Sequence, residues 1–164
     1  MISTREKKIH RFGSGFIRLT DELRNVPKEA VNFRVKKDVW NINEIVIHLA
    51  DLEAGAYVNF RRAAAEPTQK IFAFDKDQWA ESLYYYSHPY EHSLKLFRLL
   101  RASNYVLLKN MEESFWLHTV NYESHGQIMI EDLLDLYEKH LDKAIHEIAA
   151  TAELYLKLHG EQEK

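Results

Sequence analysis

The sequence predicts an all-α protein that folds as a bundle of four long helices. Apolar residues recur at steps of three and four along four separate stretches, which is the spacing of a helix with one buried face. Two of these stretches open on a residue that can cap a helix, followed three positions later by a glutamate. No convincing pair of strands lies between them, so we expect helices to pack on helices, joined by two long crossover connections.

The first helix is expected to begin at Ser3, with Glu6 completing a capping box, and to end before Pro27. Gly13 and Gly15 lie inside this helix, and each weakens it by roughly 1 kcal/mol relative to alanine. We therefore expect these glycines at a place where helices pack closely.

The second helix organises the rest of the chain and is expected from about residue 42 to residue 66, where Pro67 stops it. Asn41 and Glu44 form its predicted capping box. Residues 27–40, which precede it, are expected to form a loop.

An aromatic connection, residues 67–88, follows this helix. It contains Phe72, Phe74, Trp79 and three consecutive tyrosines, which is too much aromatic surface to leave in water. We expect it to act as a lid over one end of the bundle, with a short helix near Asp77–Leu83.

The third helix is expected to start near Pro89, and its apolar stripe runs to Met111. A second connection covers residues 113–127. The last helix is expected from about residue 129 to residue 158 and is ended by Gly160.

The composition is that of one soluble domain spanning residues 1–164, with a net charge of -3 and no cysteine. The missing cysteines exclude disulfides and thiolate chemistry, and with the lack of an apolar leader they favour a cytoplasmic protein. The charge gives no basic field for nucleic acid, and no apolar run is long enough to span a membrane.

Two histidines on different helices, His48 and His140, are the candidate functional residues. Both lie on or beside an apolar stripe, and metal sites in bundles are built from inward side chains of facing helices. The position one turn after His140 is Ala144, which cannot bind a metal, and Asp51 is the best-placed substitute. The alternative is that both histidines are structural residues with hydrogen-bonded rings.

The stretch from Trp40 to Asp51, read as Trp-x-Ile-x-Glu-Ile-Val-x-His-Leu-Ala-Asp, resembles the second helix of the DinB superfamily. The similarity is greatest to the YfiT-like putative metal-dependent hydrolases and the related bacillithiol S-transferases. It extends over roughly residues 38–150 and includes Ala56–Arg61, Phe74–Leu83, Leu94–Phe97 and Ile130–His140.

The resemblance implies a DinB-like four-helix bundle and a metal site made of three histidines. Two of them fall on His48 and His140, and the third falls on Ala144. Where many relatives have a His-x-Arg-Trp-like sequence on the third helix, this chain has Arg101-Ala-Ser-Asn104. We therefore expect a degenerate site that holds nickel or zinc weakly or has lost its metal.

Two functions follow as expectations from this resemblance. The first is a metal-dependent hydrolase or thiol S-transferase acting on a small-molecule substrate or a thiol. The second is a non-catalytic bundle that binds a small ligand or a protein partner. Family members often pair, so a homodimer is expected as well.

Overall fold

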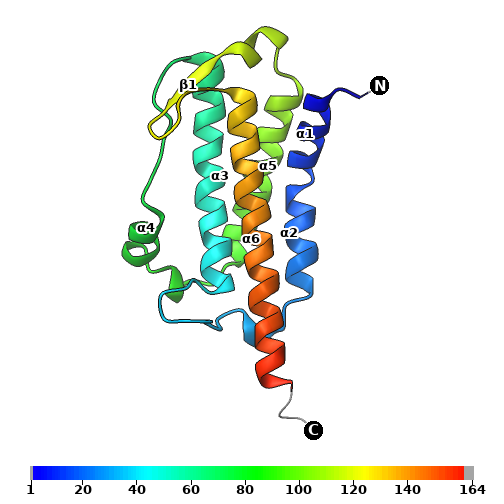
Figure 1. The fold of residues 1–164 in the computed structure, drawn as a ribbon, viewed down its shortest axis with the longest axis vertical. Helices are drawn as coiled ribbons and strands as arrows, with labels where there is room; N and C mark the ends of the chain where they lie inside the picture. The colour runs from blue at the N-terminus through cyan, green and yellow to red at the C-terminus, as the bar shows by residue number, and fades with distance from the viewer. Residues whose placement is uncertain (1, 161–164) are drawn as a thin grey trace.

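The computed structural model describes residues 2–160, which form four helical columns with a small hairpin at one end (Figure 1). The first column consists of α1 (Thr4–Gly13) and α2 (Gly15–Arg24). The other columns are α3 (Ile42–Ala65), α5 (Glu91–Lys109) and α6 (Ile130–His159), and a short α4 (Lys76–Ser82) lies outside them. The predicted all-α bundle is confirmed. No helix among these residues is long and apolar enough to cross a bilayer.

Both predicted capping boxes are present. The side chain of Ser3 accepts a hydrogen bond from the Glu6 amide, and Asn41 does the same for the Glu44 amide at 2.9 Å. In each case the glutamate carboxylate accepts the amide of the capping residue in return. These reciprocal bonds satisfy amides that the first turn leaves unpaired, and they fix where α1 and α3 begin.

The N-terminal helix is not continuous as predicted, because it breaks at Ser14. The Ser14 hydroxyl donates to the Arg11 carbonyl at 2.7 Å, which ends α1 before α2 begins. The expected close packing at both glycines is confirmed. A Cβ on Gly13 would lie 2.6 Å from the Tyr105 ring, and one on Gly15 would lie 2.8 Å from Leu141.

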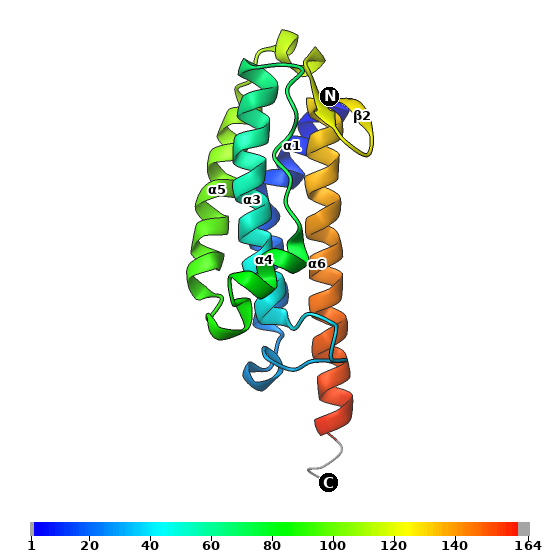
Figure 2. The same cartoon turned by 90° about the vertical axis from the view of Figure 1, so that its left-hand side faces the viewer.

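The connection between α3 and α5 crosses over the full length of the bundle, so α3 and α5 run in the same direction (Figure 1). The connection was predicted to cover one end of the bundle, and this was wrong. It descends along the side of the bundle, between α3 and α6 (Figure 2). Asn59 of α3 holds it in place by donating to the Phe72 carbonyl and accepting from the Phe72 amide. Phe72, Phe74 and Trp79 then cluster, with the last two rings stacked at 4.1 Å.

The second connection does not cross over, because α5 ends where α6 begins. It contains a 3-10 helix (Glu113–Leu117) and two antiparallel strands, β1 (Thr119–Tyr122) and β2 (Gly126–Met129), with Thr119 opposite Met129. The expectation of no strand pair was wrong here. Gly126 has a φ of +71°, a conformation that favours glycine, and it allows the chain to turn into β2.

A buried ionic network crosses the middle of the bundle and links all four columns. Arg101 of α5 is 2% exposed and contacts Glu53 of α3 at 2.8 Å and Glu138 of α6 at 2.9 Å. Asn104 donates a second hydrogen bond to Glu53 at 2.9 Å, and Arg18 of α2 reaches Glu138 at 2.6 Å. Buried charges are tolerated only when paired in this way, so the network fixes how the columns meet.

Candidate functional site

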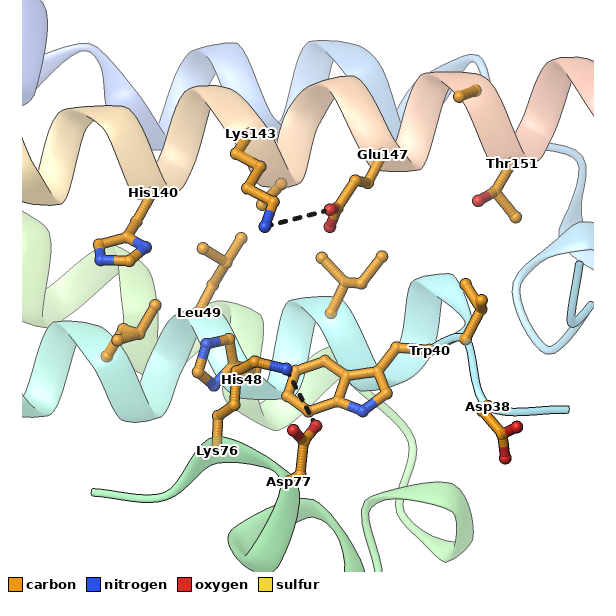
Figure 3. A pocket seen from close by; sticks show the side chains of 15 residues that line it. Asp38, Trp40, His48, Leu49, Lys76, Asp77, His140, Lys143, Glu147 and Thr151 are labelled. Carbon is orange, nitrogen blue, oxygen red and sulfur yellow. Dashed lines mark hydrogen bonds and ion pairs between the residues drawn. The ribbon is translucent and has the colours of Figure 1, made fainter. Parts of the chain in front are cut away.

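The candidate site is a cavity of about 500 Å³ between the lower halves of α3 and α6, closed on one side by the start of α4 (Figure 3). Apolar side chains form most of its wall, and charged or polar groups stand at its rim. The residues lining it are Asp38, Val39, Trp40, Ile45, His48, Leu49, Leu52, Lys76, Asp77, His140, Lys143, Ala144, Glu147, Ala150 and Thr151.

Helical periodicity explains why both candidate histidines line this cavity. His48 lies three residues after Ile45, which places it about 60° from the line of core residues on α3. His140 has the same relation to Tyr137 on α6, and Glu147 lies one further seven-residue step along that edge. The two edges face each other across the cavity, so the expected pairing of His48 with His140 is found (Figure 3).

His48 is half-buried among aromatic rings. Its ring centroid lies 4.9 Å from Trp40 and 5.9 Å from Phe74. Its Nδ1 is buried and has no hydrogen-bond partner within residues 2–160. Burial, and then the nearby charge of Lys76, lowers the pKa of His48 to about 4, so its imidazole is neutral at physiological pH.

His140 is more exposed than its position in the apolar stripe suggests. It lies at the rim of the cavity and not in the core, because the core line on α6 runs through Tyr137, Leu141 and Ala144. Partial burial and the charges of Lys143 and Lys139 hold the pKa of His140 below its usual value. Both imidazoles can therefore donate one N–H and accept at the other nitrogen.

The proposed substitute ligand, Asp51, does not line the cavity. It lies three residues after His48, a further 60° around α3, and its carboxylate accepts a hydrogen bond from the Tyr85 hydroxyl. Ala144 does line the cavity, beside His140, and is 7% exposed. The acid that the structure brings to this wall is Glu147, whose carboxylate lies 3.7 Å from the Lys143 amine.

Sequence reasoning missed the two lysines at the cavity. Lys76 is the first residue of α4, and its amine lies 4.5 Å from the centre of the Trp40 ring and 2.9 Å from Asp77. A short helix near that position was expected, but nothing in the sequence shows that the crossover brings Lys76 back beside His48. Lys143 lies three residues after His140, a further 60° around α6, and its side chain still lines the cavity.

Comparison with known proteins relates this chain to a group of bacterial proteins. No family model matches the chain. A "Putative metal-dependent hydrolase" from Oceanobacillus iheyensis is 31% identical over 101 residues, covering 62% of this chain and 58% of the relative. One of the same description from Halalkalibacterium halodurans is 26% identical, covering 64% and 61%. The matched region thus spans less than two thirds of these relatives.

Solved structures give a match over nearly the whole chain. YfiT from Bacillus subtilis, described as a probable metal-dependent hydrolase with an unusual four-helix bundle topology, superimposes with a TM-score of 0.84. That match covers 94% of this chain and 90% of YfiT at 21% identity. The chain is a YfiT-like four-helix bundle. The mycothiol-dependent maleylpyruvate isomerase shares the fold more distantly, with a TM-score of 0.70 over 87% of this chain and 60% of the isomerase.

The residues of this YfiT-like bundle do not fit a tightly held metal ion. A catalytic metal of the zinc type takes three protein ligands, and the cavity offers two imidazoles with Ala144 where a third would complete the set. Across residues 2–160, no three histidine, aspartate or glutamate side chains are grouped so as to hold an ion. The charges that most affect both imidazoles are cationic, which opposes a further cation.

The lowered pKa of His48 predicts a loss of stability in acid. In the folded state this imidazole resists protonation, whereas in the unfolded chain it protonates near pH 6.5. Protons therefore favour the unfolded state as the pH falls from about 6.5 to about 4, at a cost of up to about 3 kcal/mol. NMR titration of the His48 ring together with urea unfolding at each pH measures both effects.

A matched pair of variants isolates this contribution from that of the carboxylates. His48→Gln is expected to flatten the stability curve between pH 6.5 and 4, whereas His92→Gln, at an exposed position on α5, is expected to leave it unchanged. A His48 ring that titrates near 6.5 in the folded protein would show that burial does not lower its pKa as described.

Proposed function

We propose that this protein binds a small molecule in the cavity between α3 and α6, and that its metal centre has degenerated. In this proposal His48 and His140 hydrogen-bond to the ligand and do not share an ion. The observation that carries it is the position of Ala144, beside His140 on the cavity wall, where a third ligand would be needed. The size and the mainly apolar wall of the cavity suit a small organic ligand.

Metal titration tests the first half of the proposal. Protein purified without a histidine tag and stripped with chelator is titrated with nickel and with zinc, and its metal content as purified is measured. We expect no stoichiometric metal and a Kd weaker than about 0.1 mM, since two imidazoles alone hold an ion poorly. One equivalent bound at micromolar Kd and lost in His48→Ala would contradict the proposal.

That contrary result would favour a second function, which the relatives' names suggest. The chain would then be a metal-dependent hydrolase or thiol transferase with a new third metal ligand. Glu147, which lines the cavity on the same helix as His140, is the candidate for that ligand. The observation in favour of this reading is that Nδ1 of His48 is buried without a hydrogen-bond partner in the described residues, which is unusual for a polar atom and which a bound ion would satisfy.

Blocking the cavity tests the second half. Ala150 is an exposed residue of the cavity wall, so Ala150→Trp is expected to fill the cavity without disturbing the core. Neighbouring Ala149 does not line the cavity and serves as the matched control. Small molecules that bind the parent in a ligand-observed NMR screen are expected to bind Ala149→Trp and to be lost from Ala150→Trp. Equal binding by both variants would place the ligand elsewhere.

A further inference from the structure

We propose that the ligand of this cavity is a small organic anion with an apolar body. Its carboxylate lies at the histidine end, between Lys76 and Lys143, and its body lies against the apolar wall formed by Leu49, Leu52 and Ala144. This inference rests on the proposed function, since it names the class of molecule that the cavity binds.

The two lysines approach the histidine end from opposite walls. Lys143 comes from α6, one turn after His140, and Lys76 comes from the start of α4, beside His48 (Figure 3). Both side chains keep at least half of their surface exposed, at 72% and 55%, so their amines can approach an incoming ligand. A carboxylate placed among the two histidines would have a cation on each side.

Each of these lysines has one acid beside it, and both acids also line the cavity. Asp77 is paired with Lys76 at 2.9 Å, and Glu147 lies 3.7 Å from Lys143 on the side away from His140. Asp38 is at the opposite end of the cavity, before Trp40 (Figure 3). The histidine end therefore holds both lysines together with Asp77, and Asp38 is the acid at the far end (Figure 3).

The effect of these charges on the histidines shows which sign dominates there. After burial, the charge that lowers the pKa of His48 most is that of Lys76, followed by that of His140, and Asp77 acts in the opposite direction. On His140 the charges that act are those of Lys143 and Lys139. The lysine amines that line the cavity beside the two histidines attract an anion.

Unpaired hydrogen-bonding capacity points to the same kind of ligand. Nδ1 of His48 is buried with no partner in the described part of the chain, although buried polar atoms are normally paired. A neutral imidazole can donate its one N–H to a carboxylate, which only accepts when ionised. The apolar wall formed by Leu49, Leu52 and Ala144 suits a hydrocarbon body for the rest of the ligand.

Three probes of nearly equal shape test the charge preference: 3-phenylpropionate, 3-phenylpropionamide and 3-phenylpropylamine. Titration into the full chain, followed by NMR, is expected to give a Kd for the carboxylate at least roughly tenfold below that of the amide. The amine is expected to bind more weakly than either. This order of Kd values would show that the cavity prefers a ligand with a negative charge.

Lysine variants test which side chains cause the preference for the carboxylate probe. Lys76→Met and Lys143→Met are each expected to raise the Kd of the carboxylate probe by roughly threefold to tenfold and to leave the Kd of the amide probe unchanged. Lys139→Met is the matched control, because Lys139 also acts on His140 but does not line the cavity. An equal rise in the carboxylate Kd in Lys139→Met would mean that only the overall positive charge near His140 matters. It would overturn the position of the carboxylate between Lys76 and Lys143.

The failure of this inference can be told apart from failure of the proposed function. Any of three results would overturn the proposal that the ligand is an anion. They are equal Kd values for the carboxylate and the amide, a preference for the amine, or no carboxylate binding up to roughly 10 mM. The metal titration and the Ala150→Trp comparison judge the proposed function independently of these probes.

Discussion

Replacing Ala144 with histidine is expected to create a metal site that the parent protein lacks. Residues 140 and 144 are one helical turn apart on α6, so their side chains are neighbours, and both line the cavity opposite His48. The cavity of about 500 Å³ leaves room for the added ring. Three imidazoles around an open position form a ligand set of the zinc type.

The expected gain is at least about 100-fold in nickel or zinc affinity over the parent, or about 2.8 kcal/mol. Isothermal titration of Ala144→His at neutral pH measures it. Because metal ions require neutral imidazoles, the lowered pKa values of His48 and His140 keep the site competent well below pH 7.

Two controls make this result specific. Ala150→His places an added imidazole on the same helix and in the same cavity, but about 15 Å along the helix from His140, so it is not expected to bind metal. Adding His48→Ala to Ala144→His is expected to abolish the gain. A folded Ala144→His protein with the affinity of the parent would show that α3 and α6 are not spaced for a shared ion.

The sequence predicted the helices well because their signals are local. The capping boxes at Ser3 and Asn41 act within one turn, and the apolar stripe of α6 fixes its face without reference to other helices. The hairpin at residues 119–129 was missed because two strands of four residues carry little periodicity. The break at Ser14 was missed because a serine hydroxyl also fits a continuous helix.

The candidate site was predicted in part. His48 and His140 were identified because a titratable residue beside an apolar stripe is visible in one helix at a time. Asp51 was misplaced, since a step of three residues from a position already at the edge turns the side chain away from the cavity. Lys76 could not be placed, because its position depends on where a long crossover returns.

The buried ionic network could have been predicted from the sequence. Glu53, Arg101 and Glu138 are each flanked by apolar residues at steps of three or four, which marks a charge on a buried face. Glu53 is 1% exposed, so its carboxylate is not a solvated helix charge. Three such charges of opposing sign on three helices predict a central ion pair, and the structure contains one.

Replacing Arg101 with methionine is therefore expected to be the most destabilising single change considered. Removing the guanidinium leaves Glu53 and Glu138 buried without their shared partner, and breaking a buried ion pair in this way costs about 3–5 kcal/mol. Burial already raises the pKa of Glu53, and Arg101 is the strongest of the groups that counter this rise. Urea unfolding of Arg101→Met at pH 7 measures the loss.

The source of this cost can be separated from lost packing. Arg98→Met, an exposed position on α5, is the matched control and is expected to change stability by less than about 0.5 kcal/mol. Adding Glu53→Gln and Glu138→Gln to Arg101→Met removes both carboxylates that have lost Arg101, of which Glu138 keeps Arg18 as a partner. The two changes are expected to recover much of the loss, since an uncharged core of similar volume is tolerated. A loss in Arg101→Met that the two glutamines leave unchanged would mean that the guanidinium contributes by packing on Phe12, 3.8 Å away, and not by balancing the carboxylates.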